Sequence, residues 1–202
     1  MQGLAEFFEH GGMFMYINVL CSAATLALII ERTIYFVGKG AVNARAFLEQ
    51  IRKLVVASNT DRAVKLCDAA KEAPVARVAR AGLTRLPKGE VAVSTAIEET
   101  MADVTPDLKK RIAALWSIAN IATLIGLLGT ISGLIKSFAA VGSASPEQRS
   151  ALLSKGIAEA MYNTAFGLGI AVTCMIGHMF LANAAKKRQN ELETFSDRKS
   201  VV

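Results

Sequence analysis

Charged residues are scarce in this sequence. Asp, Glu, Lys and Arg make up 20% of its 202 residues, whereas hydrophobic residues make up 52%. A soluble domain usually has about 25% charged and about 45–50% apolar residues. The composition therefore argues against an ordinary soluble protein and favours a protein that contacts lipid.

Sites for chemistry are missing as well. The three cysteines, Cys21, Cys67 and Cys174, have neither the spacing of a metal site nor that of a disulfide framework. The sequence has no phosphate-binding glycine loop, no Ser/His/Asp set, no paired carboxylates and no basic helix with interleaved aromatic residues. We therefore expect no enzyme activity, no cofactor, no metal and no nucleic-acid partner.

Long apolar runs are present instead. Met13 to Ile30 is 18 residues without a charge, 112–135 is 24 residues, and 157–185 is 29 residues with one Glu and one His. A helix needs roughly 20 residues to cross the hydrocarbon core of a bilayer. The sequence therefore predicts three transmembrane helices.

The first apolar run is expected to be a retained helix rather than a signal peptide. Acidic residues, Glu6 and Glu9, precede it, and no Lys or Arg does. Glu31 and Arg32 follow it, where a signal peptide would have a small-residue cleavage site.

The basic residues between the runs predict the topology. Residues 38–111 hold 14 Lys and Arg against 9 Asp and Glu, and residues 186–202 hold 5 against 3. Residues 1–12 hold no Lys or Arg, and 136–156 hold 3. Because loops rich in Lys and Arg stay on the cytoplasmic side, we expect a multi-pass inner-membrane protein with a periplasmic N-terminus and a cytoplasmic C-terminus. The expected parts are a periplasmic N-terminus with the first span (1–37), a cytoplasmic helical region (38–111), the second span (112–135), a short periplasmic connection (136–156), the third span (157–185) and a basic cytoplasmic tail (186–202).

The parts outside the membrane read as helices. Apolar residues recur every three or four positions over 97–115, which predicts one helix that continues into the second span with a bend at Pro106. The third span is expected to continue likewise, with Leu192 and Phe195 on one side. No strand-like alternation is present, so we expect an all-α membrane protein whose long helices extend into the cytoplasm.

Small residues share one face of the second span. Gly126, Gly129, Thr130 and Gly133 follow each other at helical spacing, and Gly167 lies in the third span. Small residues let membrane helices approach closely, since burial of apolar side chains brings little gain in lipid. The glycines predict tight helix packing.

Polar residues gather at the start of the third span, where Glu159, Asn163 and Thr164 lie within about one turn. A carboxylate inside a membrane normally faces protein or water, although Glu159 also lies near enough to the span's outer end for an interfacial position. His178, near the other end, is expected to anchor the interface or bond another helix; a proton relay is the alternative.

Three stretches resemble one known family. GGMFMYINVLCSAATLALIIER, IANIATLIGLLGTISGLIKSF and GIAEAMYNTAFGLGIAV are similar to the three helices of the ExbB/TolQ/MotA proton-channel family. The Gly-Leu-Leu-Gly-Thr and Ala-Glu-Ala elements are the most specific parts of the match. The length and the three spans resemble the ExbB/TolQ branch.

The resemblance implies a homopentamer around single-helix partners of the ExbD/TolR type, whose membrane Asp carries the ion. Thr130, Asn163 and Thr164 would line the ion pathway, and Glu159 would be the pore acid. Glu31 and Arg32 would form an inter-subunit ion pair or an ordinary interfacial one. The implied function is a stator-type, pore-forming subunit that couples proton flow to envelope transport, envelope maintenance or gliding motility. A non-conducting homo-oligomeric scaffold in the bilayer is the alternative.

The sequence also departs from the family pattern. Thr123 and Thr173 stand where relatives often carry proline, and Ile17-Asn18 replaces a further proline. Because proline kinks a helix, the absence of these prolines argues against a gating mechanism built on such kinks. The two threonines could instead bond to the preceding turn and bend the helix mildly.

Overall fold

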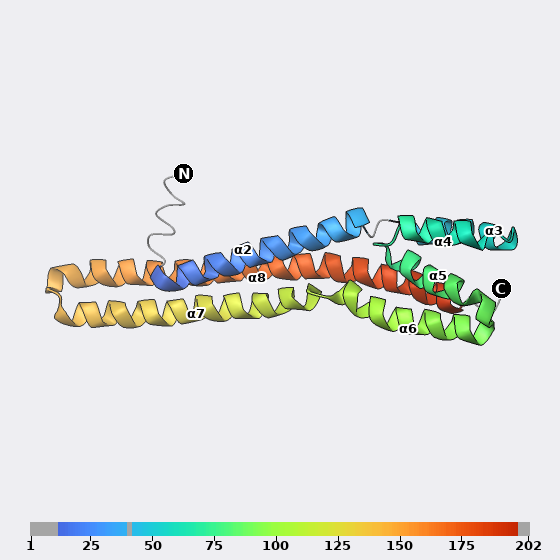
Figure 1. Cartoon of the computed structure of the whole chain (residues 1–202). Coiled ribbons are helices and arrows are strands. Elements are labelled where there is room, and N and C mark those ends of the chain that lie inside the picture. The colour runs from blue at the N-terminus through green and yellow to red at the C-terminus, as the bar shows by residue number, and fades with distance from the viewer. Residues whose placement is uncertain (1–11, 40–41, 198–202) are drawn as a thin grey trace. The chain divides into compact units, whose positions relative to one another are not determined.

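The computed structural model of the protein describes residues 12–39 and 42–197. Its elements are α2 (Gly12–Ile34), the π-helical turn η1 (Tyr35–Lys39), α3 (Ala44–Val56), α4 (Thr60–Ala69), α5 (Pro74–Arg85), the 3-10 turn η2 (Leu86–Lys88), α6 (Glu90–Lys109), α7 (Ile112–Ser143) and α8 (Pro146–Asp197) (Figure 1). These residues contain no strand, and three helices are long and apolar enough to cross a membrane. The predicted all-α fold with three membrane-spanning helices is confirmed. Glu6 and Glu9 lie outside the described residues.

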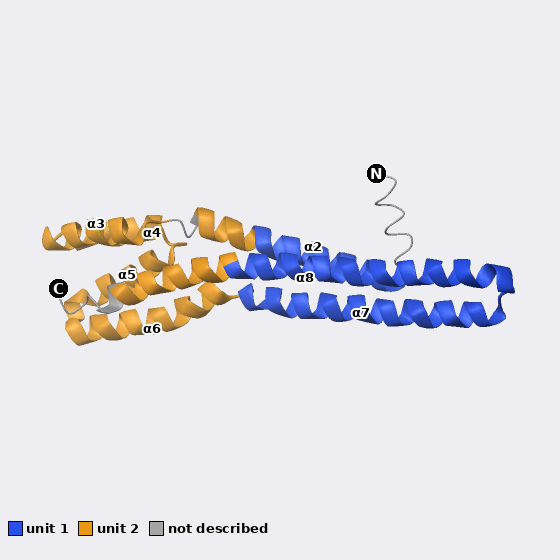
Figure 2. Ribbon diagram, turned by 180° about the vertical axis from the view of Figure 1, so that it is seen from behind, with its two compact units in different colours: residues 1–30, 111–179 blue, residues 31–110, 180–202 orange. Residues whose placement is uncertain are grey.

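The chain divides into two compact units, which are described separately (Figure 2). Unit 1 contains residues 1–30 and 111–179, and unit 2 contains residues 31–110 and 180–202.

Unit 1 is built from the apolar parts of α2, α7 and α8. A buried cluster of small and medium side chains holds it together: Ala119, Ala122, Ile170, Ala171 and Cys174. Large apolar side chains cover its outside instead; Leu124, for example, is 64% exposed. This distribution is typical of helices whose surroundings are lipid or other membrane helices.

Unit 2 buries a more ordinary core. Helix α5 starts with Pro74, whose fixed φ suits the first turn of a helix, and it buries Val78. The turn after it ends at Gly89, whose φ of 94° favours glycine. Helix α6 then buries Val104 and Leu108, each 1% exposed.

The helices differ from the expectation at two places. The prediction of an unbroken helix from 97 to 115 was wrong. Helix α6 ends at Lys109, and Arg111 takes a left-handed φ of 65° before α7 begins. The apolar spacing continues across this break, so the pattern conceals it. Both α7 and α8 also reach into the 136–156 connection, which leaves only Ala144 and Ser145 outside a helix. Leu192 is buried, whereas the side chain of Phe195 lies outside the described residues.

Candidate functional site

The glycines of α7 lie against the backbone and small groups of α8. A Cβ atom added to Gly126 would lie 2.9 Å from the carbonyl oxygen of Asn163, and one added to Gly129 would lie 2.8 Å from Asn163 Cγ. One added to Gly133 would lie 3.2 Å from Ala160 Cβ. Any larger residue at the first two positions would push α7 away from α8.

Helix α8 carries a matching set of small residues. A Cβ atom on Gly167 would lie 2.6 Å from the carbonyl oxygen of Ala122, and one on Gly156 would lie 2.5 Å from Ser137 Cβ. Gly156, Ala160, Asn163 and Gly167 follow at spacings of 4, 3 and 4. Of these four residues, only Gly167 was predicted from the sequence to pack helices, although the regular spacing indicates a shared helix face.

The side chains of Thr130 and Thr164 meet in this tight contact. Their hydroxyl groups are hydrogen-bonded to each other. Thr130 Oγ1 also lies 3.2 Å from the carbonyl oxygens of Gly126 and Ala160, and Thr164 Oγ1 lies 3.3 Å from that of Gly126. Each hydroxyl has one proton to donate, so the acceptors outnumber the protons. The pair can therefore exchange one hydrogen-bond arrangement for another without moving a helix.

Asn163 and Glu159 lie next to this pair on α8. Asn163 is 3% exposed, and its side chain faces Gly129. Glu159 is half-buried, and its Oε1 lies 3.3 Å from the position of a Cβ added to Gly12. Gly12 is the first residue of α2 and has a φ of 63°. The start of a helix carries partial positive charge and suits a carboxylate.

The structure thus brings the four predicted pathway residues together in unit 1. Glu159 and Thr164 are five residues apart on one helix, or about 7.5 Å along its axis, and Thr130 joins them from α7. A carboxylate, a carboxamide and two hydroxyls follow one another over this length. Such a series of oxygen groups can hold water or pass protons.

The charged pair at the end of α2 belongs to unit 2. Arg32 is 6% exposed and donates to the carbonyl oxygen of Asp107 at 3.4 Å. Its guanidinium carbon lies 5.6 Å from the ring centre of Tyr35. Glu31 is exposed. Within one chain, Arg32 therefore joins α2 to α6; its predicted contact with another subunit stays a prediction.

His178 connects α8 to α7. Its Nδ1 lies 3.1 Å from the carbonyl oxygen of Ile112, and its ring centre lies 6.0 Å from that of Trp116. Because a carbonyl oxygen only accepts, Nδ1 carries the proton in this contact. This geometry favours the helix-bonding interpretation of His178 over a proton relay.

Two buried polar groups of α2 were missed by sequence reasoning. Thr25 Oγ1 donates to the carbonyl oxygen of Cys21 at 2.8 Å and lies 3.0 Å from Cys174 Sγ on α8. Asn18 is fully buried, and neither its Oδ1 nor its Nδ2 has a hydrogen-bond partner among the described residues. A single polar residue in an apolar run gives no signal of the side it faces.

The threonines at the missing family prolines form the expected back-bonds. Thr123 Oγ1 donates to the carbonyl oxygen of Ala119, and Thr173 Oγ1 to that of Gly169, each at 2.9 Å. Each bond stays within its own helix, between residues four apart.

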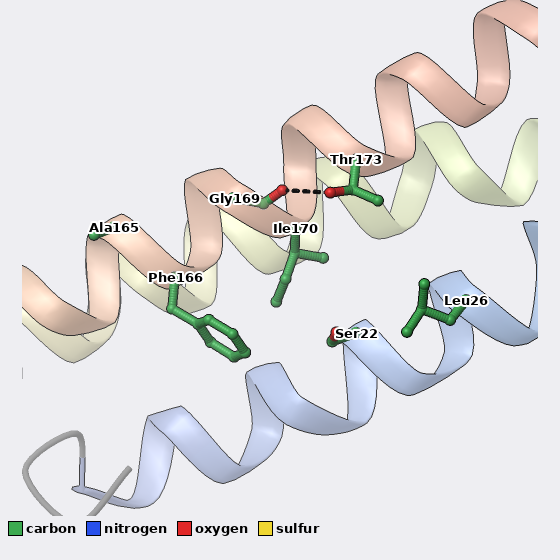
Figure 3. A pocket seen from close by; sticks show the side chains of 7 residues that line it. All are labelled: Ser22, Leu26, Ala165, Phe166, Gly169, Ile170 and Thr173. Carbon is green, nitrogen blue, oxygen red and sulfur yellow. Dashed lines mark hydrogen bonds between the residues drawn. The ribbon is translucent and has the colours of Figure 1, made fainter. Parts of the chain in front are cut away.

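A groove of about 430 Å³ lies between α2 and α8 in unit 1 (Figure 3). Phe166 and Ile170 of α8 and Leu26 of α2 line it, with Ser22 and Thr173 among its few polar groups. None of its lining residues is titratable. The groove therefore lacks a carboxylate and the hydroxyl pair that α7 and α8 share.

Comparison with known proteins identifies the family. Residues 70–194, which include the whole contact of α7 with α8, match the model of the MotA/TolQ/ExbB proton channel family. The chain belongs to this family. It is 28% identical over 204 residues to the biopolymer transport protein exbB1 of Vibrio cholerae, an alignment that covers 96% of this chain and 85% of that protein.

Two Synechocystis proteins are also similar to this chain over most of its length. The chain is 29% identical over 156 residues to the putative biopolymer transport protein ExbB-like 3, covering 77% of this chain and 73% of that protein. It is 24% identical over 180 residues to ExbB-like 1, covering 86% and 68%. With its three apolar helices, this MotA/TolQ/ExbB member is an inner-membrane protein of a channel family, a stator-type subunit in general terms.

Proposed function

We propose that this chain is the pore-forming subunit of an inner-membrane motor driven by ion-motive force. Protons pass along Glu159, Asn163 and the hydroxyl pair of Thr130 and Thr164. The observation that carries this proposal is the hydroxyl pair, because its acceptors outnumber its protons inside an apolar helix contact. The family match supports it independently.

The membrane potential can supply the energy for such a motor. One charge that crosses the membrane potential releases about 2.3 kcal/mol per 100 mV. The three apolar runs contain no Asp, so we propose that a single-helix partner of the ExbD/TolR type supplies the titrating aspartate. The chain itself forms the surrounding homo-oligomer, a pentamer, with its N-terminus in the periplasm and its C-terminus in the cytoplasm. Residues 38–111 and 186–202 are the cytoplasmic parts.

Transport across the envelope is the process we favour. The relatives carry the name biopolymer transport protein, and this name suggests the same process for this chain. Envelope maintenance and gliding motility are the other processes that such a motor drives.

A second function has an observation of its own. Both hydroxyls reach backbone carbonyl oxygens of α7 or α8 within one chain. This favours a structural bridge between the helices, as in a non-conducting scaffold.

The two functions differ in how substitutions act. Glu159→Gln and Thr164→Val are compared with Thr164→Ser, which keeps the hydroxyl, and with Thr173→Val. Thr173 is an exposed threonine of the same helix, and among the described residues its hydroxyl bonds to its own preceding turn. The complex co-purified with its native partner is reconstituted in vesicles, proton flux is measured with a pH dye, and assembly is measured by size-exclusion chromatography.

A conducting role predicts at least tenfold lower flux for Glu159→Gln and Thr164→Val, with the oligomer intact and with both controls near wild type. Loss of the oligomer in the same two variants supports the scaffold. Normal flux in both variants contradicts the pathway altogether.

A further inference from the structure

Unit 2 contains a pocket that the channel function does not use. It lies among α4, α5 and α6 and has a volume of about 450 Å³. Lys71, Arg77 and Arg80 line it, together with Asp68 and Thr100. Three cations therefore face one carboxylate, and the lining carries a net positive charge.

Ion pairs hold the two arginines in position. Arg80 Nε lies 2.6 Å from Asp68 Oδ1, and Arg77 Nη1 lies 3.2 Å from Asp107 Oδ2. A guanidinium has five N–H donors, and each of these contacts engages one nitrogen atom of the arginine. Further donors remain on both side chains, and Lys71 forms no ion pair with the part of the chain that the structure describes. The pocket offers preformed donors for an anion.

Two contacts within unit 2 link the pocket to the last turn of α2. Asp107, the partner of Arg77, accepts a hydrogen bond from Arg32 through its carbonyl oxygen. Arg32 lies in the last turn of α2, two residues beyond the apolar run that ends at Ile30. The headgroup layer is roughly 5–7 Å thick on each side of the hydrocarbon core, so Arg32 is expected in this layer, and Arg77 of the pocket is linked to Arg32 through Asp107.

We propose that this pocket binds the phosphate group of an anionic phospholipid from the adjacent leaflet. Guanidinium groups bind phosphate oxygens through paired N–H donors, and lysine adds a point charge. Basic pockets beside membrane helices on the cytoplasmic side recognise anionic headgroups in this way. Lys71 is the cation that turns toward the phosphate without giving up an ion pair. The proposal does not depend on ion conduction.

The test uses the full-length protein in a neutral detergent. Short-chain phosphatidylglycerol, short-chain phosphatidylcholine and inorganic phosphate are titrated separately, and the thermal unfolding midpoint is followed by circular dichroism. Lys71→Gln is compared with Lys65→Gln. Lys65 is an exposed lysine of α4 that does not line the pocket, so both variants lose one charge from unit 2. The size of the oligomer is checked for each variant.

Phosphatidylglycerol should raise the unfolding midpoint of the wild type at concentrations where phosphatidylcholine does not. Lys71→Gln should need about ten times more of it, whereas Lys65→Gln should match the wild type. An equal, Lys71-dependent response to inorganic phosphate would overturn the lipid as the source and leave a free-phosphate site. Equal responses of both variants, or dissociation of the oligomer by Lys71→Gln alone, would overturn the anion site.

Discussion

The described residues of unit 1 and unit 2 form helices and no strands, but the closest helix contacts of the two units differ in the size of their side chains. In unit 1, α7 and α8 meet closely through glycine and alanine. A Cβ atom added to Gly167 of α8 would lie only 2.6 Å from the carbonyl oxygen of Ala122 on α7. In unit 2, the larger side chain of Ile97 on α6 lies against Gly82 of α5, and larger apolar side chains such as Val78 and Leu108 are buried. Water drives the second kind of packing, whereas lipid does not reward apolar burial, so close backbone contact takes its place. The environment of each unit therefore explains its composition.

Removing bulk should be most damaging in unit 2. Leu108 is 1% exposed, and Leu108→Ala should lower the free energy of unfolding by about 2–5 kcal/mol through lost burial and a cavity. Chemical denaturation of the full-length protein, followed by circular dichroism, measures the change. Val91→Ala is the control, since Val91 is 81% exposed on the same helix and should change stability little. Similar losses in both variants would contradict a packed core at α6.

Adding bulk should be most damaging in unit 1. Gly167→Ala places its new methyl group against the Ala122 carbonyl oxygen and should cost about 1–3 kcal/mol through overpacking. Gly169→Ala is a close control, because a Cβ atom at Gly169, two residues along the same helix, meets nothing within 4 Å. Thermal unfolding in detergent compares the two. A control as unstable as Gly167→Ala would mean that the loss of glycine itself, and not the helix contact, sets the cost.

For buried polar residues of unit 1, the effect of a substitution on stability should depend on whether the side chain is hydrogen-bonded, and not on its burial alone. Asn18 is fully buried with neither polar side-chain atom bonded to the described residues, so Asn18→Leu should stabilise the protein by about 1–3 kcal/mol. Thr25 is equally buried but bonded, so Thr25→Val should destabilise it by about 1 kcal/mol. The same thermal assay reads both. A loss of stability in Asn18→Leu would show that its carboxamide is bonded in the assembled protein.

The thiol of unit 2 offers a smaller, pH-dependent test. Burial raises the pKa of Cys67 to about 11, and the neighbouring Asp68 adds to the increase while Arg80 opposes it. Because the pKa is higher in the folded state, the stability that the thiol contributes is complete below pH 9 and is lost as the pH rises toward 11. With an unfolded pKa near 9.0, the loss of stability should begin just above pH 9 and grow until about pH 11.

Unfolding midpoints of the wild type and of Cys67→Ala, measured between pH 8 and pH 11, check this expectation. The difference between the two should change above pH 9 and stay constant below it. A constant difference over the whole range would mean that the thiol ionises alike in the folded and unfolded protein.

The sequence predicted the parts of this comparison that depend on composition and spacing. Apolar run length fixes the three spans, and the positions of Gly126, Gly129 and Gly133 select one face of α7. The break at Arg111 could not be read, because apolar residues keep their helical spacing across it. The burial of Asn18 depends on how α2 packs in the folded protein, which no local pattern records. The ion pathway itself stays a prediction, because the proposed pathway involves several copies and a partner.

The turn between α7 and α8 has a consequence for how this hairpin can move. Only Ala144 and Ser145 separate the two helices, so α7 has no slack with which to slide along its neighbour. A shift by one residue would also rotate its side chains by about 100°, and the hydroxyl of Thr130 would leave that of Thr164. The short turn therefore keeps the two helices in register when a force acts along the hairpin.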